Sequence, residues 1–182
     1  KEGRTLLMGT VFISGSILAT YWKTDEALLS VCAVIFVVTA LARVWFMQAY
    51  AQNKPTIKSI DQARWWEHGY VVGAAVSVAT LGMWCYLSFA CTNDTFSRVI
   101  SFSMTIGYLA GIFGRNFSSE RAVDLQITCA AVPMIAALLI HGNAYYWFFA
   151  LLLVPYFLGV KFIAQRLRTT LLSAVLNSNE KT

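Results

Sequence analysis

Charged residues are scarce in this chain. Only 13% of its 182 residues are Asp, Glu, Lys or Arg, whereas 58% are hydrophobic. A water-soluble domain of this length needs far more polar surface, so the composition excludes that class. The apolar residues also lie in long blocks, and a helix that crosses the hydrocarbon core of a bilayer takes about 20 of them. We therefore expect an integral membrane protein that is surrounded by the lipid bilayer.

Motifs that would indicate an enzyme or a metal site are also lacking. None of the four cysteines belongs to a C-x-x-C pair or has a histidine at metal-ligand spacing. His68 and His141 are expected on opposite faces of the membrane, so they cannot share one haem or metal. The chain contains no Walker loop, no H-E-x-x-H and no G-x-S-x-G motif. We expect no cofactor, no metal and no catalytic activity in this chain.

Long apolar runs predict an all-α bundle of six membrane-spanning helices over residues 1–160. The six runs cover residues 6–22, 27–47, 70–89, 99–113, 125–140 and 145–160. The first run resembles a signal peptide because Lys1 and Arg4 precede it. The charge distribution described next favours a genuine span instead. Residues 161–182 are then a cytoplasmic helix or a linker to a further C-terminal domain.

Lysine and arginine are distributed unevenly between the two sides of this bundle. Two of the fourteen, Lys23 and Arg98, fall on one side. The other twelve fall on the side of the termini and the two longer links: Lys1, Arg4, Arg43, Lys54, Lys58, Arg64, Arg115, Arg121, Lys161, Arg166, Arg168 and Lys181. Cytoplasmic loops carry the excess of basic residues, so both termini are expected in the cytoplasm. This placement explains the net charge of +5 without a nucleic-acid partner.

Tryptophans, small residues and prolines indicate how the helices lie and pack. All six tryptophans fall at predicted span ends, as in an aromatic belt. Gly107 and Gly111 form a G-x-x-x-G motif, which lets two helices approach closely in lipid, and we expect that contact inside the bundle. Pro133 and Pro155 lie inside the fifth and sixth runs, where each should kink its helix. Such kinks would open space for a small or amphiphilic ligand.

Ionisable residues are absent from the middle of the runs and gather at the cytoplasmic interface. Arg43 and Arg115 end the second and fourth runs, whereas Glu67 and Asp124 precede the third and fifth. This is the polarity that helix dipoles favour. The residues are either snorkelling anchors, or Arg43–Glu67 and Arg115–Asp124 pairs that change when a ligand enters. Together with Asn116 they are the candidates for a ligand or switch site.

Residues 161–177 predict an amphipathic helix that leaves the membrane. Its apolar stripe consists of Ile163, Leu167, Leu171 and Val175. The stripe suits pairing with its copy in a parallel homodimer, or contact with the lipid headgroups. No proline or glycine interrupts this segment. A movement of the last span should therefore reach the cytoplasm as a rigid shift or rotation.

Three stretches of sequence, with the six spans, resemble a known family. They are RWWEHGYVVG at residues 64–73, GRNF at 114–117 and RLRTTL at 166–171. They are similar to the N-terminal membrane region of bacterial GGDEF/EAL signalling proteins, particularly of the alphaproteobacterial type. The resemblance implies an inner-membrane sensor module followed by a PAS domain and domains that make and degrade cyclic di-GMP. The chain has no GGDEF-like or EAL-like run, so catalysis would belong to a further C-terminal part.

The leading interpretation is a membrane input module that regulates a cyclic di-GMP cyclase or phosphodiesterase. A small transporter or channel is an alternative of another class, and the lack of a charge at mid-depth counts against it. A lipid-acting membrane enzyme is a third. There Arg43, Arg115 and the tryptophans would bind a headgroup, but no nucleophile or metal site is recognisable.

The uneven charge distribution generates a testable topology. Single cysteines replacing Lys58 and Lys23 in a background without native cysteines should be labelled from opposite sides of the membrane, with Lys58→Cys reached from the cytoplasm. A membrane-impermeant thiol reagent on intact cells and inverted vesicles measures this. Labelling of both positions from the same side would contradict six spans.

Overall fold

The computed structural model describes residues 2–53, 59–116 and 119–179; within the helices, the side chains of 2–5, 112–116, 172 and 174–179 are not described. These residues form helices joined by short links, and no strand occurs among them. The helices are α1 (Glu2–Thr24), α2 (Ala27–Asn53), α3 (Ile60–Ala90), α4 (Thr95–Asn116), α5 (Glu120–Ile140) and α6 (Ala144–Asn179). The all-α prediction is confirmed.

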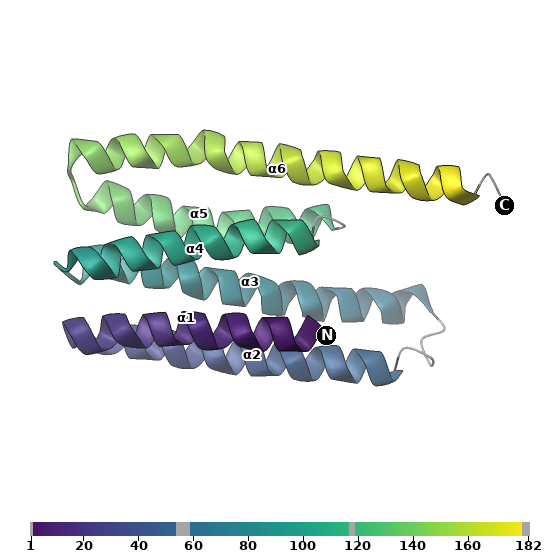
Figure 1. Cartoon of the computed structure of the whole chain (residues 1–182), viewed down its shortest axis with the longest axis horizontal. Coiled ribbons are helices and arrows are strands. Elements are labelled where there is room, and N and C mark those ends of the chain that lie inside the picture. The colour runs from purple at the N-terminus through teal and green to yellow at the C-terminus, as the bar shows by residue number, and fades with distance from the viewer. Residues whose placement is uncertain (1, 54–58, 117–118, 180–182) are drawn as a thin grey trace.

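The helices lie side by side along one long axis and alternate in direction (Figure 1). The start of α1 and the end of α6 lie at the same end of the bundle, together with the α2–α3 and α4–α5 connections. We call this the N/C end and the opposite one the Lys23 end. At the N/C end, α6 extends beyond the other helices. Two chain ends on the same side are what an even number of crossings requires.

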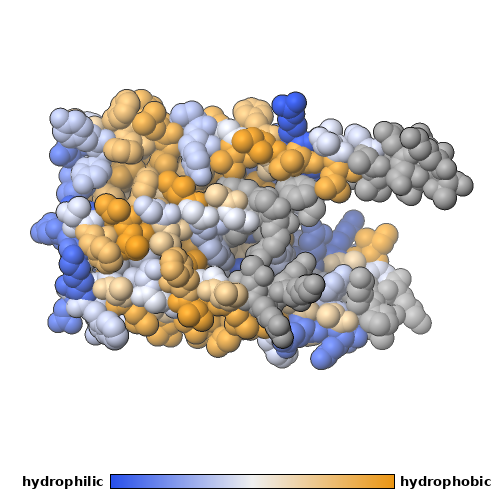
Figure 2. Space-filling view, in the orientation of Figure 1, coloured by the Kyte–Doolittle hydropathy of each residue, from blue (hydrophilic) through white to orange (hydrophobic). Residues whose placement is uncertain are grey.

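Four helices are long and apolar enough, in their described residues, to cross a membrane: α2, α3, α5 and residues 144–171 of α6. Figure 2 shows apolar surface over the middle of the bundle and hydrophilic side chains towards its ends. Large apolar side chains such as Val11, Leu151 and Phe162 are exposed in the structure. A surface of this kind needs lipid around it. The chain is therefore a membrane protein, and the crossing of α1 and α4 stays a prediction.

Local sequence sets where several helices begin and end. Ser59 precedes α3 and its hydroxyl accepts a hydrogen bond from the backbone N–H of Gln62 at 3.2 Å. Asp94 precedes α4 and accepts from the N–H of Ser97 at 2.8 Å. Both are N-caps, which satisfy backbone donors that have no partner within the helix. The cap at Ser59 explains why α3 begins ten residues before the apolar run at residues 70–89.

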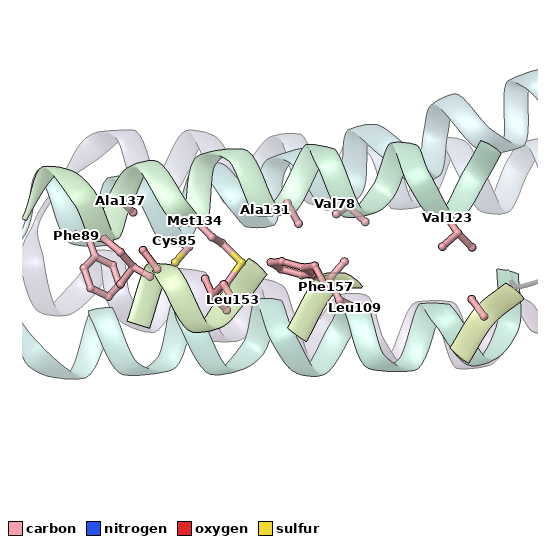
Figure 3. Close-up of a cluster of buried hydrophobic side chains, with 14 residues drawn as sticks. Val78, Cys85, Phe89, Leu109, Val123, Ala131, Met134, Ala137, Leu153 and Phe157 are labelled. Carbon is pink, nitrogen blue, oxygen red and sulfur yellow. The ribbon is translucent and has the colours of Figure 1, made fainter. Parts of the chain in front are cut away.

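Two apolar clusters form the interior, and α3 contributes to both. One lies among α1, α2 and α3, and the other among α3, α4, α5 and α6. In the second, Figure 3 shows Met134 of α5 pointing toward Leu153 and Phe157 of α6. Trp84 of α3 belongs to the first cluster, is fully buried, and donates from Nε1 to the Thr20 hydroxyl at 3.1 Å. Its expected place in an aromatic belt is therefore corrected, whereas Trp22 and Trp147 are exposed.

The small residues that bring two helices together are not those of the G-x-x-x-G motif. Gly107 and Gly111 are exposed, and a Cβ built on either would meet no atom within 4 Å. The contact expected for them inside the bundle is therefore absent among the described residues. The close approach occurs at Gly82 of α3, where a Cβ would lie 2.5 Å from Pro133 Cγ and 3.1 Å from the carbonyl oxygen of Cys129. Pro133 thus serves as a packing surface for α3.

Helices α5 and α6 continue through their prolines. Pro133 lies within Glu120–Ile140, and Pro155 lies within Ala144–Asn179 and is exposed. The kink angles expected at these positions stay predictions, as does a ligand space opened by them. The unbroken course of α6 agrees with the predicted helix that continues from the last span.

The Gly82 contact predicts a position-specific effect on stability. Gly82→Ala should lower the free energy of unfolding by about 1–3 kcal/mol, because the neighbouring atoms belong to a proline ring and to backbone and have little freedom to move. The midpoint of thermal unfolding in dodecyl maltoside measures the change.

Gly107→Ala is the matched control. It introduces the same methyl group into open space and should leave the midpoint unchanged or slightly higher, since alanine favours helix over glycine. Equal midpoints for the two variants would show that α3 and α5 do not meet at Gly82.

Candidate functional site

The side chain of Arg43 lies inside the bundle, between α2, α3 and α4. It is only 4% exposed, although it sits in the N/C half of α2. Its Nη1 donates to the Ser77 hydroxyl at 3.3 Å and to the Tyr108 hydroxyl at 3.5 Å. The Tyr70 ring centre lies 5.5 Å from Cζ, within cation–π range. The snorkelling interpretation is therefore not what the structure shows: the guanidinium points inward.

Small and hydroxylated residues of α3 make room for this arginine. A Cβ at Gly73 would lie 2.8 Å from Arg43 Cγ and 3.3 Å from Cδ, so the aliphatic stem occupies the place of a side chain. Ser77 follows Gly73 by four residues and therefore lies on the same face of the helix. Its hydroxyl donates to the Gly73 carbonyl at 2.9 Å, which leaves its oxygen to accept from Arg43. From α4, Tyr108 packs edge-on against Phe36, with ring centres 6.1 Å apart.

The charge of Arg43 is uncompensated among the described residues. A guanidinium stays protonated in proteins. None of the ion pairs between described side chains involves Arg43. Its Nε and Nη2 are buried and have no hydrogen-bond partner. A buried charge without a counter-charge costs several kcal/mol, which makes this the most unusual electrostatic feature of the chain.

The acidic residues that sequence analysis paired with arginine lie elsewhere. Glu67 is exposed, and one of its carboxylate oxygens accepts from the Ser119 hydroxyl at 3.4 Å rather than from Arg43. Among the described side chains, Asp124 pairs with Lys161. The side chains of Arg115 and Asn116 lie outside the described residues. Of the five candidate residues, Arg43 alone is seen deep inside the bundle.

A group of polar contacts joins the first turns of α5 to residues 161–168 of α6. Asp124 lies 2.9 Å from Lys161 Nζ, and Glu120 lies 3.1 Å from Arg168 Nη1. Gln165 Nε2 donates to the second carboxylate oxygen of Glu120 at 2.8 Å. We call these five residues the α5–α6 clasp. Sequence analysis missed it, although the spacings of four and three between Lys161, Gln165 and Arg168 place these residues on one helix face.

Three of the four residues in the apolar stripe expected on α6 have described side chains. Ile163, Leu167 and Leu171 are exposed, as pairing with a second copy would require. The side chain of Val175 lies outside the described residues. The homodimer stays a prediction.

At the Lys23 end, polar side chains join the end of α1 and the end of α5 to the start of α4 and the link before it. Lys23 Nζ lies 2.9 Å from Asp94 Oδ1, and Arg98 Nη2 donates to the Thr92 carbonyl at 2.5 Å. Arg98 Nη1 lies 2.8 Å from His141 Nε2. Since the guanidinium only donates, this histidine nitrogen is the acceptor. Cys91 is an exposed free thiol at this end.

The described side chains offer no group of three or more His, Cys, Asp or Glu that could hold a metal ion. What the chain does present is one buried, positively charged hydrogen-bond donor and a polar clasp on an exposed helix. No protein family, curated protein or solved structure matches the chain.

The Lys23 end predicts an acid-sensitive contribution to stability. The hydrogen bond from Lys23, and next the one from the Ser97 backbone, hold the pKa of Asp94 below its ordinary value of 3.8. The contribution is therefore complete above that ordinary pKa and is lost as the pH falls through the lower folded-state value. Asp94→Asn should show a smaller loss of thermal midpoint between about pH 6 and about pH 3, because asparagine still caps α4 but does not titrate.

Asp61→Asn is the control, since Asp61 is almost fully exposed and its arginine partner is 3.8 Å away. It should follow the acid response of the unmodified chain. An identical acid response in Asp94→Asn would contradict the role assigned to the Asp94 carboxylate.

Proposed function

We propose that this chain is a membrane-embedded input module whose output leaves through α6. All six helices cross the bacterial inner membrane, both ends lie in the cytoplasm, and the chain itself catalyses no reaction. Its downstream target is a cyclic di-GMP cyclase or phosphodiesterase. That identity rests on the resemblance of residues 64–73, 114–117 and 166–171 to the membrane regions of GGDEF/EAL proteins.

One observation carries the proposal: α6 is a single helix of 36 residues, Ala144–Asn179. Its first part is apolar enough to cross a membrane, and its last part projects beyond the rest of the bundle (Figure 1). A helix moves largely as a rigid rod over such a length, so a displacement among the spans is carried to its far end. A protein that only needed an anchor would not require this continuity.

The α5–α6 clasp supplies a contact that can change. Its ion pairs are partly exposed, with side-chain exposures of 39% and 43% for Lys161 and Asp124 and 40% and 48% for Arg168 and Glu120. Pairs of this kind contribute about 0–1 kcal/mol each. Two positions of α6 against α5 can thus differ little in free energy, and a ligand that prefers one of them shifts the population.

The exposed stripe of Ile163, Leu167 and Leu171 supports output as a dimer. Burial of these side chains against a second copy would fix the rotation of the two α6 helices relative to each other. Diguanylate cyclase domains, as the resemblance implies, act when two of them face each other. The rotation of α6 would therefore set the output.

Transport of an anion is the second candidate, because Arg43 is a buried charge of the kind that sequence analysis found lacking. The two candidate functions predict different results in a transport assay. A transporter moves its substrate into proteoliposomes without a downstream domain, whereas an input module does not.

The proposal predicts a dependence on the phase of α6. In the full-length protein, four residues inserted after Arg168 would rotate everything downstream by about 40°, from the 3.6-residue turn. Cyclic di-GMP synthesis or breakdown should change while membrane insertion stays intact. Mass-spectrometric quantification of cyclic di-GMP, with immunoblotting of membranes, measures both.

Seven residues inserted at the same position form the matched control. They restore the apolar stripe to within about 20° of its original direction and lengthen the helix further than four do. Activity should be closer to that of the unmodified protein. Unchanged output and signal response with the four-residue insertion would mean that α6 is only a tether.

A further inference from the structure

The free donors of Arg43 form one edge of its guanidinium. The N–H of Nε and one N–H of Nη2 lie side by side and parallel, which matches the two oxygens of a carboxylate or phosphate. Within the described part of the chain, these two nitrogens have no hydrogen-bond partner. The third, Nη1, is occupied by Ser77 and Tyr108. The side chain is therefore held by one nitrogen, while its bidentate edge remains available.

Among the residues that the structure describes, the surroundings of Arg43 supply hydroxyls but no negative charge. Ser77 and Tyr108 are neutral acceptors, and the Tyr70 ring contributes only its π face. The described acidic side chains at the N/C end are engaged elsewhere: Asp61 with Arg64, Glu67 with Ser119, and Glu120 and Asp124 with the extension of α6. A neutral, hydroxyl-lined environment cannot offset the desolvation of a guanidinium, whereas a bound anion can.

We propose that the Nε/Nη2 edge of Arg43 binds a singly charged oxyanion carried by an amphiphile, either a carboxylate or a phosphodiester. One guanidinium balances one negative charge, which favours these groups over a phosphate dianion. The amphiphile follows from the position of the site within a bundle whose middle is surrounded by apolar side chains (Figure 2). A hydrocarbon tail there stays in lipid while the head group enters between α2, α3 and α4.

Neither free nitrogen is accessible to solvent in this structure, so the site is closed. Binding requires the neighbouring helices or side chains to move, and the anion is therefore selective for an open arrangement. This gives the input module proposed above a ligand class, and in that respect the inference extends the proposed function. The binding site itself rests only on Arg43 and its contacts.

The test uses the chain of residues 1–182 in dodecyl maltoside at a pH where a fatty acid is ionised. The probes are laurate, phosphatidylglycerol, and inorganic phosphate or acetate. Dodecanol is the neutral counterpart of laurate. The thermal midpoint of the unmodified chain should rise with laurate or with phosphatidylglycerol and not with dodecanol, because a ligand that binds only the folded state stabilises it. A rise with laurate identifies a carboxylate, and a rise with phosphatidylglycerol identifies a phosphodiester. A rise with only the small anions would contradict an amphiphilic ligand.

Variants of Arg43 connect the response to the guanidinium. Arg43→Met should abolish the rise, and its midpoint without ligand should equal or exceed that of the unmodified chain because an unpaired buried charge is removed. Arg43→Lys keeps the charge but lacks the fork, so binding should weaken about tenfold. Arg64→Met removes an exposed arginine on the same side and should leave the response intact. That control separates the site from general attraction of anions to the surface.

A second measurement does not depend on the stability of a variant. The ¹⁵N resonance of Arg43 Nε, assigned with Arg43→Lys, should shift on addition of the anion that raises the midpoint, since a carboxylate or phosphodiester would bond directly to that N–H. The absence of any response by the unmodified chain, or an equal response in Arg43→Met, would overturn the proposal. The insertion in α6 can leave the output unchanged while Arg43 still binds the anion, and the output can change while no anion binds. The two proposals are therefore tested separately.

Discussion

The packing of α3 against its neighbours is the constraint on which the other contacts depend. Gly82 lets α3 lie against the Pro133 ring and the backbone of α5. Two residues later, Trp84 donates a hydrogen bond to Thr20 of α1. One helix thus joins the two apolar clusters. A side chain at Gly82 would separate α3 from α5, and the shift would extend along α3 to Gly73 and Ser77. The closed environment of Arg43 depends on the position of α3.

The number and course of the helices follow from the sequence. Which side of each helix contacts the other helices does not. Long apolar runs, caps such as Ser59 and the absence of breakers in α6 are local features, and they can be read residue by residue. Which side of a membrane helix faces protein is a different matter. Lipid is as apolar as a core, so an apolar helix carries little amphipathic signal to distinguish the two. Gly107 was expected at a helix contact because of its G-x-x-x-G motif, whereas the contact at Gly82 was not predicted.

The same limit explains why the inward orientation of Arg43 was not predicted. Its position near the end of an apolar run is compatible with snorkelling to the interface, which is the less costly arrangement for an isolated helix. The inward orientation depends on Gly73 and Ser77, thirty or more residues away on another helix, and on Tyr108 on a third. No local pattern carries that information. The α5–α6 clasp, by contrast, has a local signature in the spacing of its α6 residues.

Under the proposed function, the path of a signal would run from Arg43 through α3 and α5 to the projecting end of α6. An anion bound between α2, α3 and α4 would act on the face of α3 that holds Gly73 and Ser77. The close contact at Gly82 would pass a displacement of α3 to α5, whose first turns carry Glu120 and Asp124. Tight packing transmits a shift but does not by itself make a switch, which needs an element with two arrangements of similar free energy. The α5–α6 clasp is weak, polar and partly exposed. Of the contacts along this path, its ion pairs are the ones that can break and form again without opening the apolar interior.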